Sequence, residues 1–282
     1  MKDGVSTWEQ AVLWLRQQSD QQALVEAAYY DDPLLLSAMR YHASNEWSAV
    51  KMLLPERPSE ALDVGAGRGI ASYALAKEGY DVAALEPDES PLVGTEAIRG
   101  LARESGLPID VYQGFSEALP FPDAQFGLVF ARSVLHHSRD LGTACGEIYR
   151  VLQSGGRFLA IREHVISKTQ DLDAFLESHP LHRIYGGENA YLLNQYQKAL
   201  RDVGFEIDHV IGPLDSPMNF ATNTSAMLQG EVARRVAFGA PWLEALAETV
   251  LRLPGLWRFL LPVLRRLDQR PGRLYSFVCR RP

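Results

Sequence analysis

The stretch Asp63-Val64-Gly65-Ala66-Gly67-Arg68-Gly69 decides the fold of this chain. A short apolar run precedes it and a helical pattern follows at 70–76, so the sequence predicts a strand, a glycine turn and a helix. That unit sets a nucleoside or a phosphate against a helix N-terminus. A dinucleotide fingerprint, G-x-G-x-x-G, would need a glycine where this chain has Ile70. The spacing therefore favours a ligand with a ribose and an amino-acid tail over one with a pyrophosphate.

A carboxylate closes the next apolar run. Residues 82–85 are apolar, and Glu86 follows them, seventeen residues after Gly69. A carboxylate in that place can accept hydrogen bonds from both hydroxyls of a ribose. The alternative is a solvent-exposed glutamate after an ordinary βαβ turn. We favour the ribose contact.

Five motifs in the same order and spacing resemble the class I S-adenosylmethionine-dependent methyltransferases. They are D-V-G-A-G-R-G at 63–69 with A-L-E-P-D at 84–88, G-F-S-E-A-L-P-F at 114–121, F-G-L-V-F at 126–130, V-L-H-H at 134–137, and R-V-L-Q-S-G-G-R-F at 150–158. The pattern is similar to the quinone-biosynthesis-like subgroup of type 11 methyltransferases, which act on small molecules. The resemblance covers about residues 58 to 165 and continues more weakly to 211.

The resemblance implies that S-adenosylmethionine is the cofactor and S-adenosylhomocysteine the product. It places the cofactor beyond the carboxyl ends of the strands. The residues that we expect there are Asp63, Gly65, Ala66, Gly67, Glu86, Pro87, Phe115, Ser116, Glu117, Ala131, Arg132 and His136. Because N-terminal helices of this family close over the methionine end, we add Tyr30 and Arg40.

Position 115 departs from the pattern of the family. The usual residue there is aspartate, whereas this chain has Phe115. A phenyl ring cannot accept a hydrogen bond from the adenine amino group. We therefore expect Ser116 or Glu117 to make that contact, and Phe115 to pack on the adenine ring.

Candidate proton acceptors follow two strands. His136 and His137 come after the expected fourth strand, and Glu163 and His164 come after the fifth. Since a hydroxyl or carbon acid must lose a proton on methylation, we name His164, His137 and Glu163 as candidate catalytic residues. The alternatives are a histidine that only packs near the cofactor and a hydrogen-bonded pair at a strand end.

A second polar cluster lies at 179–191, an irregular segment with several aromatic residues. We expect it to contact the substrate through His179, His182, Tyr185, Glu188 and Tyr191. His179, His182, Glu188 and His164 are also a donor set that suits zinc or iron. Their spacing matches no metal signature, so we predict no metal site. Glu188 has a further interpretation as a cap of the following helix.

The strand and helix patterns predict an α/β protein with a doubly wound, mostly parallel, seven-stranded Rossmann-like sheet. We expect strands near 60–64, 81–85, 109–113, 126–131, 156–162, 205–211 and 274–280. The chain divides into an N-terminal helical cap at 1–54, a cofactor-binding core at 55–211 and 271–282, and a helical insertion at 212–270. We interpret this insertion as a substrate lid.

Charge, cysteine spacing and apolar runs indicate which partners and which cell compartment to expect. The net charge of −7 argues against nucleic-acid binding. Cys145 and Cys279 have neither metal nor redox spacing, and residues 1–5 contain no apolar signal core, so we expect a cytoplasmic protein with free thiols. The apolar run within 251–267 is too short to cross a bilayer. It packs on the core or on a second subunit of a homodimer, or it contacts a membrane surface or a lipid.

The sequence thus predicts methyl transfer from S-adenosylmethionine to a small, apolar molecule. Oxygen is the first candidate for the acceptor atom, ahead of carbon and nitrogen. One alternative is another S-adenosylmethionine chemistry on the same fold, and another is a catalytically silent cofactor-binding or scaffold protein. A nicotinamide oxidoreductase is disfavoured because Ile70 replaces the third glycine.

Overall fold

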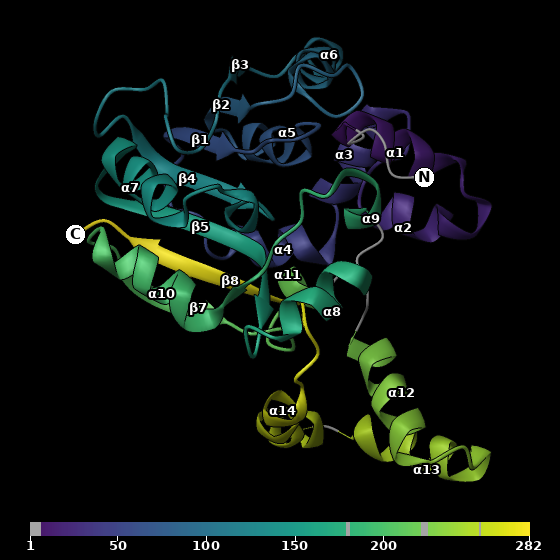
Figure 1. Cartoon of the computed structure of the whole chain (residues 1–282). Helices are drawn as coiled ribbons and strands as arrows, with labels where there is room; N and C mark the ends of the chain where they lie inside the picture. Colours follow the sequence, from purple (N-terminus) through teal and green to yellow (C-terminus); the bar gives the residue numbers. More distant parts are fainter. Residues whose placement is uncertain (1–6, 179–180, 221–224, 254) are drawn as a thin grey trace.

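The computed structural model describes residues 7–178, 181–220, 225–253 and 255–282. A twisted sheet forms the centre of the molecule, with the strand order β3-β2-β1-β4-β5-β8-β7 (Figure 1). Its strands are β1 Glu60–Val64, β2 Asp81–Glu86, β3 Ile109–Gln113, β4 Phe126–Arg132, β5 Leu152–Ile166, β7 Glu206–Ile211 and β8 Arg273–Arg280. Strand β8 is antiparallel to both neighbours and the other main strands are parallel. The predicted fold class is confirmed, with a two-residue β6, Tyr191–Leu192, as an unpredicted eighth strand.

Both faces of the sheet are buried, as parallel sheets require. In β4, Leu128 and Phe130 pack into one apolar cluster, whereas Val129 and Ala131 pack into the other. The first cluster contains helices α5 Ile70–Lys77 and α6 Thr95–Ser105, and the second contains α7 Leu141–Val151 and α10 Leu193–Asp202. Alternate residues of one strand therefore anchor opposite helical layers. Cys145 and Cys279 are free thiols buried in the second layer.

The N-terminal helices pack on the helical layer at one face of the sheet and on the 181–185 segment. They are α1 Trp8–Gln17, the 3₁₀ turn η1 Ser19–Gln21, α2 Gln22–Ala27, α3 Leu34–His42 and α4 Asn45–Lys51. Helices α3 and α4 join the first cluster through Tyr41 and Trp47, which are fully buried. Helix α1 instead packs on Leu181 beside the short helix α9, His182–Tyr185, while α8, Asp171–Ser178, follows β5. The predicted helical cap and the predicted substrate-contacting segment therefore meet through α1 and α9.

The insertion before β8 is helical, as expected. It contains α11 Pro217–Phe220, α12 Ser225–Val236, α13 Pro241–Leu251 and α14 Leu256–Leu267. Figure 1 shows α12 and α13 as a pair that extends beyond the sheet. Large apolar side chains are exposed on this insertion, among them Phe238 at 95% and Phe259 at 81%. Within the described ranges, none of the helices has the length and apolarity to cross a membrane.

Candidate active site

One cavity of about 1070 Å³ lies at the carboxyl ends of the parallel strands and runs under α1 and α2. Its volume lies at the upper end of the range of small-molecule pockets, about 300–1,000 Å³. The predicted cofactor residues that line it are Tyr30, Asp63, Gly65, Ala66, Gly67, Glu86, Pro87, Phe115, Ser116, Glu117, Arg132 and His136. The predicted catalytic and substrate residues that line it are His137, His164, Tyr185 and Glu188.

The glycine turn needs its glycines for two different reasons. Gly65 and Gly67 have φ values of 62° and 55°, in the left-handed region that L-residues avoid. A Cβ on Gly65 would come within 2.7 Å of the side chain of Val134. A Cβ on Gly67 would meet no protein atom within 4 Å. Gly65 thus permits close packing of the loop after β4, and Gly67 lines the open cavity.

Glu86 is tied to the same turn. Its Oε2 accepts a hydrogen bond from the backbone N–H of Gly67 at 2.8 Å, and its Oε1 accepts one from Asp88 at 3.1 Å. Burial of the carboxylate raises the pKa of Glu86 to about 7. The remaining lone pairs are suited to the hydroxyls of a ribose. The carboxylate therefore fixes the turn and has acceptor capacity left for a ligand.

Asp63 lies behind the turn. Its Oδ2 accepts a hydrogen bond from the hydroxyl of Ser72 at 2.6 Å, and its side chain is 1% exposed. Burial raises the pKa of Asp63 to about 7. The side chain therefore orders β1 against α5.

The expected adenine end lies at 115–117. Phe115 is half exposed and lines the cavity, with the guanidinium of Arg139 5.1 Å from its ring centre. Glu117 accepts a hydrogen bond from the backbone N–H of Arg139 at 2.7 Å and another from the hydroxyl of Ser116 at 3.0 Å. These bonds hold the loop in place and leave the phenyl face of Phe115 toward Arg139.

Arg68 lines the cavity and was not among the predicted site residues. The side chain lies within the glycine turn and donates to the backbone carbonyls of Tyr29 and Asp31, both at 2.9 Å. It also pairs with the carboxylate of Asp32. Arg68 therefore fastens the segment around Tyr30 over the cofactor side of the cavity. Only the three-dimensional contact between 29–32 and the turn reveals this role.

Arg40 differs from the expectation. Its guanidinium pairs with Asp31 at 2.6 Å, its side chain is 43% exposed, and it is absent from the described lining of the cavity. Arg132 does line the cavity, but it is held by Glu46 of α4, with Nε 2.6 Å from Oε1. Arg40 therefore connects two N-terminal segments, and Arg132 connects α4 to the sheet. The third predicted residue that differs is Ala131, which is buried in the sheet and absent from the described lining of the cavity.

Glu163 is not at the surface of the cavity. Its carboxylate is 0% exposed and accepts the backbone N–H groups of Val134, Leu135 and His136, each at 3.1 Å. It also contacts Nδ1 of His136 at 2.7 Å. A carboxylate with four such partners cannot reach a substrate. The candidate catalytic role of Glu163 is therefore corrected to one of positioning, because it holds the 3₁₀ turn η2, Leu135–His137, in place.

Three imidazoles meet above that turn. The ring centres of His136 and His137 are 4.1 Å apart, and those of His136 and His164 are 4.6 Å apart. Burial opposes a charge on His136, but its bonds with Glu163 and Glu188 outweigh this and raise the pKa of His136 to about 9. Burial, together with the charge of His136, lowers the pKa of His137.

The segment at 182–191 contributes two of its predicted residues to the cavity. Tyr185 packs on Trp8 and donates its hydroxyl hydrogen bond to Oε1 of Glu188 at 3.0 Å. Tyr191 and His182 are absent from the lining in the described part of the chain, and the hydroxyl of Tyr191 donates to the carbonyl of Ser138 at 3.3 Å. Tyr191 therefore supports the loop after η2, and Nδ1 of His182 is buried without a hydrogen-bond partner among the described residues. His179 lies outside the described residues.

Comparison with known proteins agrees with this geometry. A family model described as "Methyltransferase domain" matches residues 62–160. The uncharacterized methyltransferase YodH of Bacillus subtilis is 31% identical over 170 residues, which are 60% of this chain and 69% of YodH. The chain belongs to the class I S-adenosylmethionine-dependent methyltransferases. Relatives whose names specify an acceptor atom include O-, C- and N-methyltransferases.

Other relatives of this methyltransferase are matched over less of their length. YcgJ of Bacillus subtilis is 32% identical over 116 residues, 41% of this chain and 44% of YcgJ. Among solved structures, geranyl diphosphate C-methyltransferase from Streptomyces coelicolor A3(2) superposes with a TM-score of 0.59 at 13% identity, over 90% of this chain and 88% of the other. That likeness shows the fold. The cofactor of the family is S-adenosylmethionine, and the residues at the glycine turn and at Glu86 fit a ribose and an amino-acid tail.

Proposed function

We propose that this methyltransferase transfers the methyl group of S-adenosylmethionine to a hydroxyl oxygen of a small, largely apolar molecule. The observation that supports the proposal is a single cavity in which the glycine turn and Glu86 share a wall with His137 and His164. Apolar side chains of the N-terminal helices, the 181–185 segment and the insertion also line it, namely Trp8, Leu15, Leu24, Leu181, Phe220 and Leu228, together with polar ones such as Asn219, Glu231 and Arg270. An apolar lining with a few polar groups is typical of pockets for small molecules.

The histidines favour oxygen as the acceptor atom. A hydroxyl must lose a proton as it is methylated, whereas a neutral amine attacks with a free lone pair. Nδ1 of His137 lies 3.0 Å from the carbonyl oxygen of Gly187, and Nδ1 of His164 lies 3.1 Å from that of Gly272. Since a carbonyl only accepts, each Nδ1 carries the hydrogen and each Nε2 has a lone pair. Either imidazole is therefore able to accept a proton inside the cavity.

We assign the proton acceptor to His137. Its turn η2 follows Val134, whose side chain packs against Gly65, so His137 stands next to the cofactor half of the cavity. In the transfer, the acceptor oxygen bonds to the methyl carbon while the methyl–sulfur bond breaks. The electron pair of that bond stays on the sulfur, and S-adenosylhomocysteine is the product. The hydroxyl proton passes to Nε2 of His137. The remaining work of the protein is alignment and exclusion of water.

A screen with labelled methyl donor tests the proposal. The purified protein is incubated with methyl-labelled S-adenosylmethionine and a panel of apolar phenols, alcohols, amines and carbon acids. We expect label in ether products, and a loss of at least about 100-fold in H137A with S-adenosylhomocysteine affinity within threefold of the parent. Transfer to amines or carbon acids alone would exclude the oxygen assignment. Cofactor binding without any transfer would support a silent cofactor-binding protein.

A further inference from the structure

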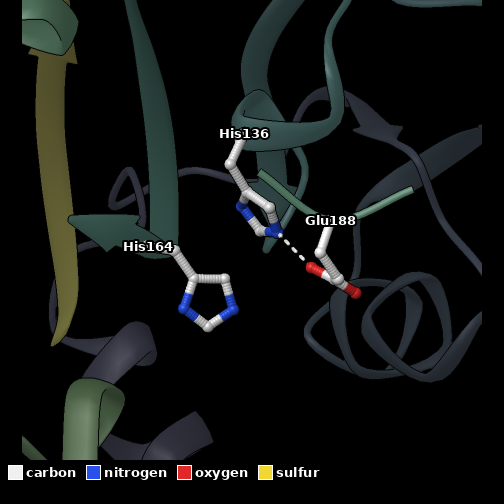
Figure 2. A group of neighbouring side chains, drawn as sticks. All are labelled: His136, His164 and Glu188. Atoms are coloured by element: carbon white, nitrogen blue, oxygen red, sulfur yellow. Dashed lines mark ion pairs between the residues drawn. The ribbon is translucent and has the colours of Figure 1, made fainter. Parts of the chain in front are cut away.

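Three side chains from separate segments form a cluster of metal-binding type on the wall of the cavity. They are His136 of η2, His164 of β5 and Glu188 of the loop after α9, and each offers one ligand atom within 4.8 Å of the other two. Figure 2 shows the two imidazoles and the carboxylate around a common space, with the ion pair between His136 and Glu188 dashed. Two histidines and one carboxylate are a donor set of divalent first-row metal ions.

Each of the three side chains is oriented by a second residue, as metal ligands in proteins are. The carboxylate of Glu163 holds Nδ1 of His136 at 2.7 Å, and the carbonyl of Gly272 holds Nδ1 of His164 at 3.1 Å. Both rings therefore present Nε2 as the ligand atom. The hydroxyl of Tyr185 donates to Oε1 of Glu188, and Oε2 is the atom that faces the imidazoles.

One separation within the cluster, whose ligand atoms all lie within 4.8 Å of one another, has the length expected between two ligands of one metal ion. Nε2 of His136 is 3.5 Å from Oε2 of Glu188, longer than the roughly 2.7–2.9 Å of a charge-assisted hydrogen bond. Two ligands that each lie about 2.1 Å from one metal ion are separated by about 3.0 Å in octahedral and about 3.4 Å in tetrahedral geometry. The observed separation is close to the second value. By contrast, the 2.7 Å contact of His136 with Glu163 has the length of a hydrogen bond.

We propose that His136, His164 and Glu188 bind a divalent first-row metal ion, and that its open positions hold the oxygen of the methyl acceptor. Three protein ligands with an open side are the arrangement of catalytic rather than structural metal sites. The cavity supplies the open side. The role of the ion rests on the proposed O-methylation: it would favour loss of the hydroxyl proton and orient the oxygen toward the methyl group. Nε2 of His137 lies 3.9 Å from Oε2 of Glu188, so the imidazole of His137 lies beside the proposed site.

The inference departs from the sequence-based prediction of no metal. The donor set that the sequence suggested joined His164 and Glu188 to His179 and His182. The fold brings His136 to them instead, because β4 and β5 are adjacent and parallel and their carboxyl ends share one edge. His136 was assigned to the cofactor on its motif alone.

Titration with Co²⁺ tests the metal site directly. The full chain is stripped with a chelator, dialysed and titrated with Co²⁺ while calorimetry and the visible d–d absorption are recorded. We expect one equivalent bound, with at least tenfold weaker binding in H164A and in E188Q. H209A is the matched control, because His209 is exposed on the edge strand β7 and should bind as the parent does. Binding of S-adenosylhomocysteine to each variant verifies that it is folded.

Two results would overturn the metal site: no Co²⁺ bound to the folded parent, or equal binding in H164A, E188Q and the parent. Loss of O-methylation after chelation, with recovery on addition of metal, supports the role in the reaction. Transfer that is undiminished in metal-free protein contradicts that role and leaves the proposed O-methylation intact. Conversely, tight Co²⁺ binding without transfer to any hydroxyl supports the site and contradicts the O-methylation.

Discussion

Glu163 holds His136 at 2.7 Å from a position with no solvent exposure, and the same carboxylate accepts the backbone N–H groups of 134–136. One buried side chain of β5 thereby fixes the turn after β4 that presents two histidines to the cavity. Glu163 lies on β5 and the turn follows the neighbouring strand β4. The positions of the two histidines therefore depend on how these two strands are aligned.

Substitution E163Q tests this coupling. Glutamine has one acceptor oxygen, so its amide NH₂ would face two of the donors that Glu163 now satisfies. We expect the free energy of unfolding to fall by about 3 kcal/mol, measured by urea denaturation. The control is E206Q, which removes the exposed carboxylate on β7 that pairs with Arg280. We expect it to change the free energy of unfolding by less than about 0.5 kcal/mol. Equal small losses in both variants would show that Glu163 does not hold the turn.

The buried Asp63 gives the stability a pH dependence. Because burial raises its pKa to about 7, the folded state binds a proton more tightly than the unfolded state does. The contribution of Asp63 to stability is therefore full below about pH 4 and is lost as the pH rises through 7. We expect D63N, which keeps an acceptor for Ser72, to raise the free energy of unfolding by roughly 2–4 kcal/mol at pH 8 and by little at pH 4. A gain that is the same at both pH values would rule this explanation out.

Glu86 should control cofactor affinity. Loss of its carboxylate removes the acceptor for the ribose and the bond to Gly67, each worth roughly 1.5–3 kcal/mol for a charged group. We expect E86A to weaken S-adenosylhomocysteine binding at least about tenfold in calorimetry. The nearby exposed residue Glu89 provides the control E89A, which should bind as the parent does. A change below threefold in E86A would show that another residue holds the ribose.

The insertion should act on the acceptor and not on the cofactor. Leu228 and Glu231 of α12 line the cavity, whereas the glycine turn and Glu86 belong to β1 and β2. We expect that replacing residues 225–267 with a short Gly-Ser link leaves S-adenosylhomocysteine affinity within threefold and abolishes methyl transfer. Normal turnover by the shortened chain would assign the insertion to a subunit or membrane contact, to which its exposed Phe238 and Phe259 are also suited.

The sequence predicted the elements of the core well because local patterns determine them. The apolar run before Asp63 and the one before Glu86 became β1 and β2 within a residue of their expected bounds. The predicted glycine turn lines the cavity, and its role in binding the cofactor stays a prediction. The strand order β3-β2-β1-β4-β5-β8-β7 was not predicted and comes from the structure.

Contacts between distant segments could not be predicted in the same way. Nothing in the neighbourhood of Arg68 shows that it binds the carbonyls at 29 and 31, and nothing near Glu163 shows that its carboxylate is enclosed by residues 134–136. Position on the correct edge of the sheet suggested a catalytic Glu163, but the side chain points to the neighbouring strand end. The cluster of His136, His164 and Glu188 likewise depends on the packing of a loop against two strands.

A crystal structure of the protein with S-adenosylhomocysteine is the most direct test of the central claim, that one cavity joins the cofactor to a histidine-lined acceptor site. The account predicts the two ribose hydroxyls within hydrogen-bond distance of Glu86, the amino-acid tail along Gly65 and Gly67, and the sulfur directed at the space between His137 and His164. A ligand bound elsewhere, or one whose sulfur points away from the histidines, would contradict it.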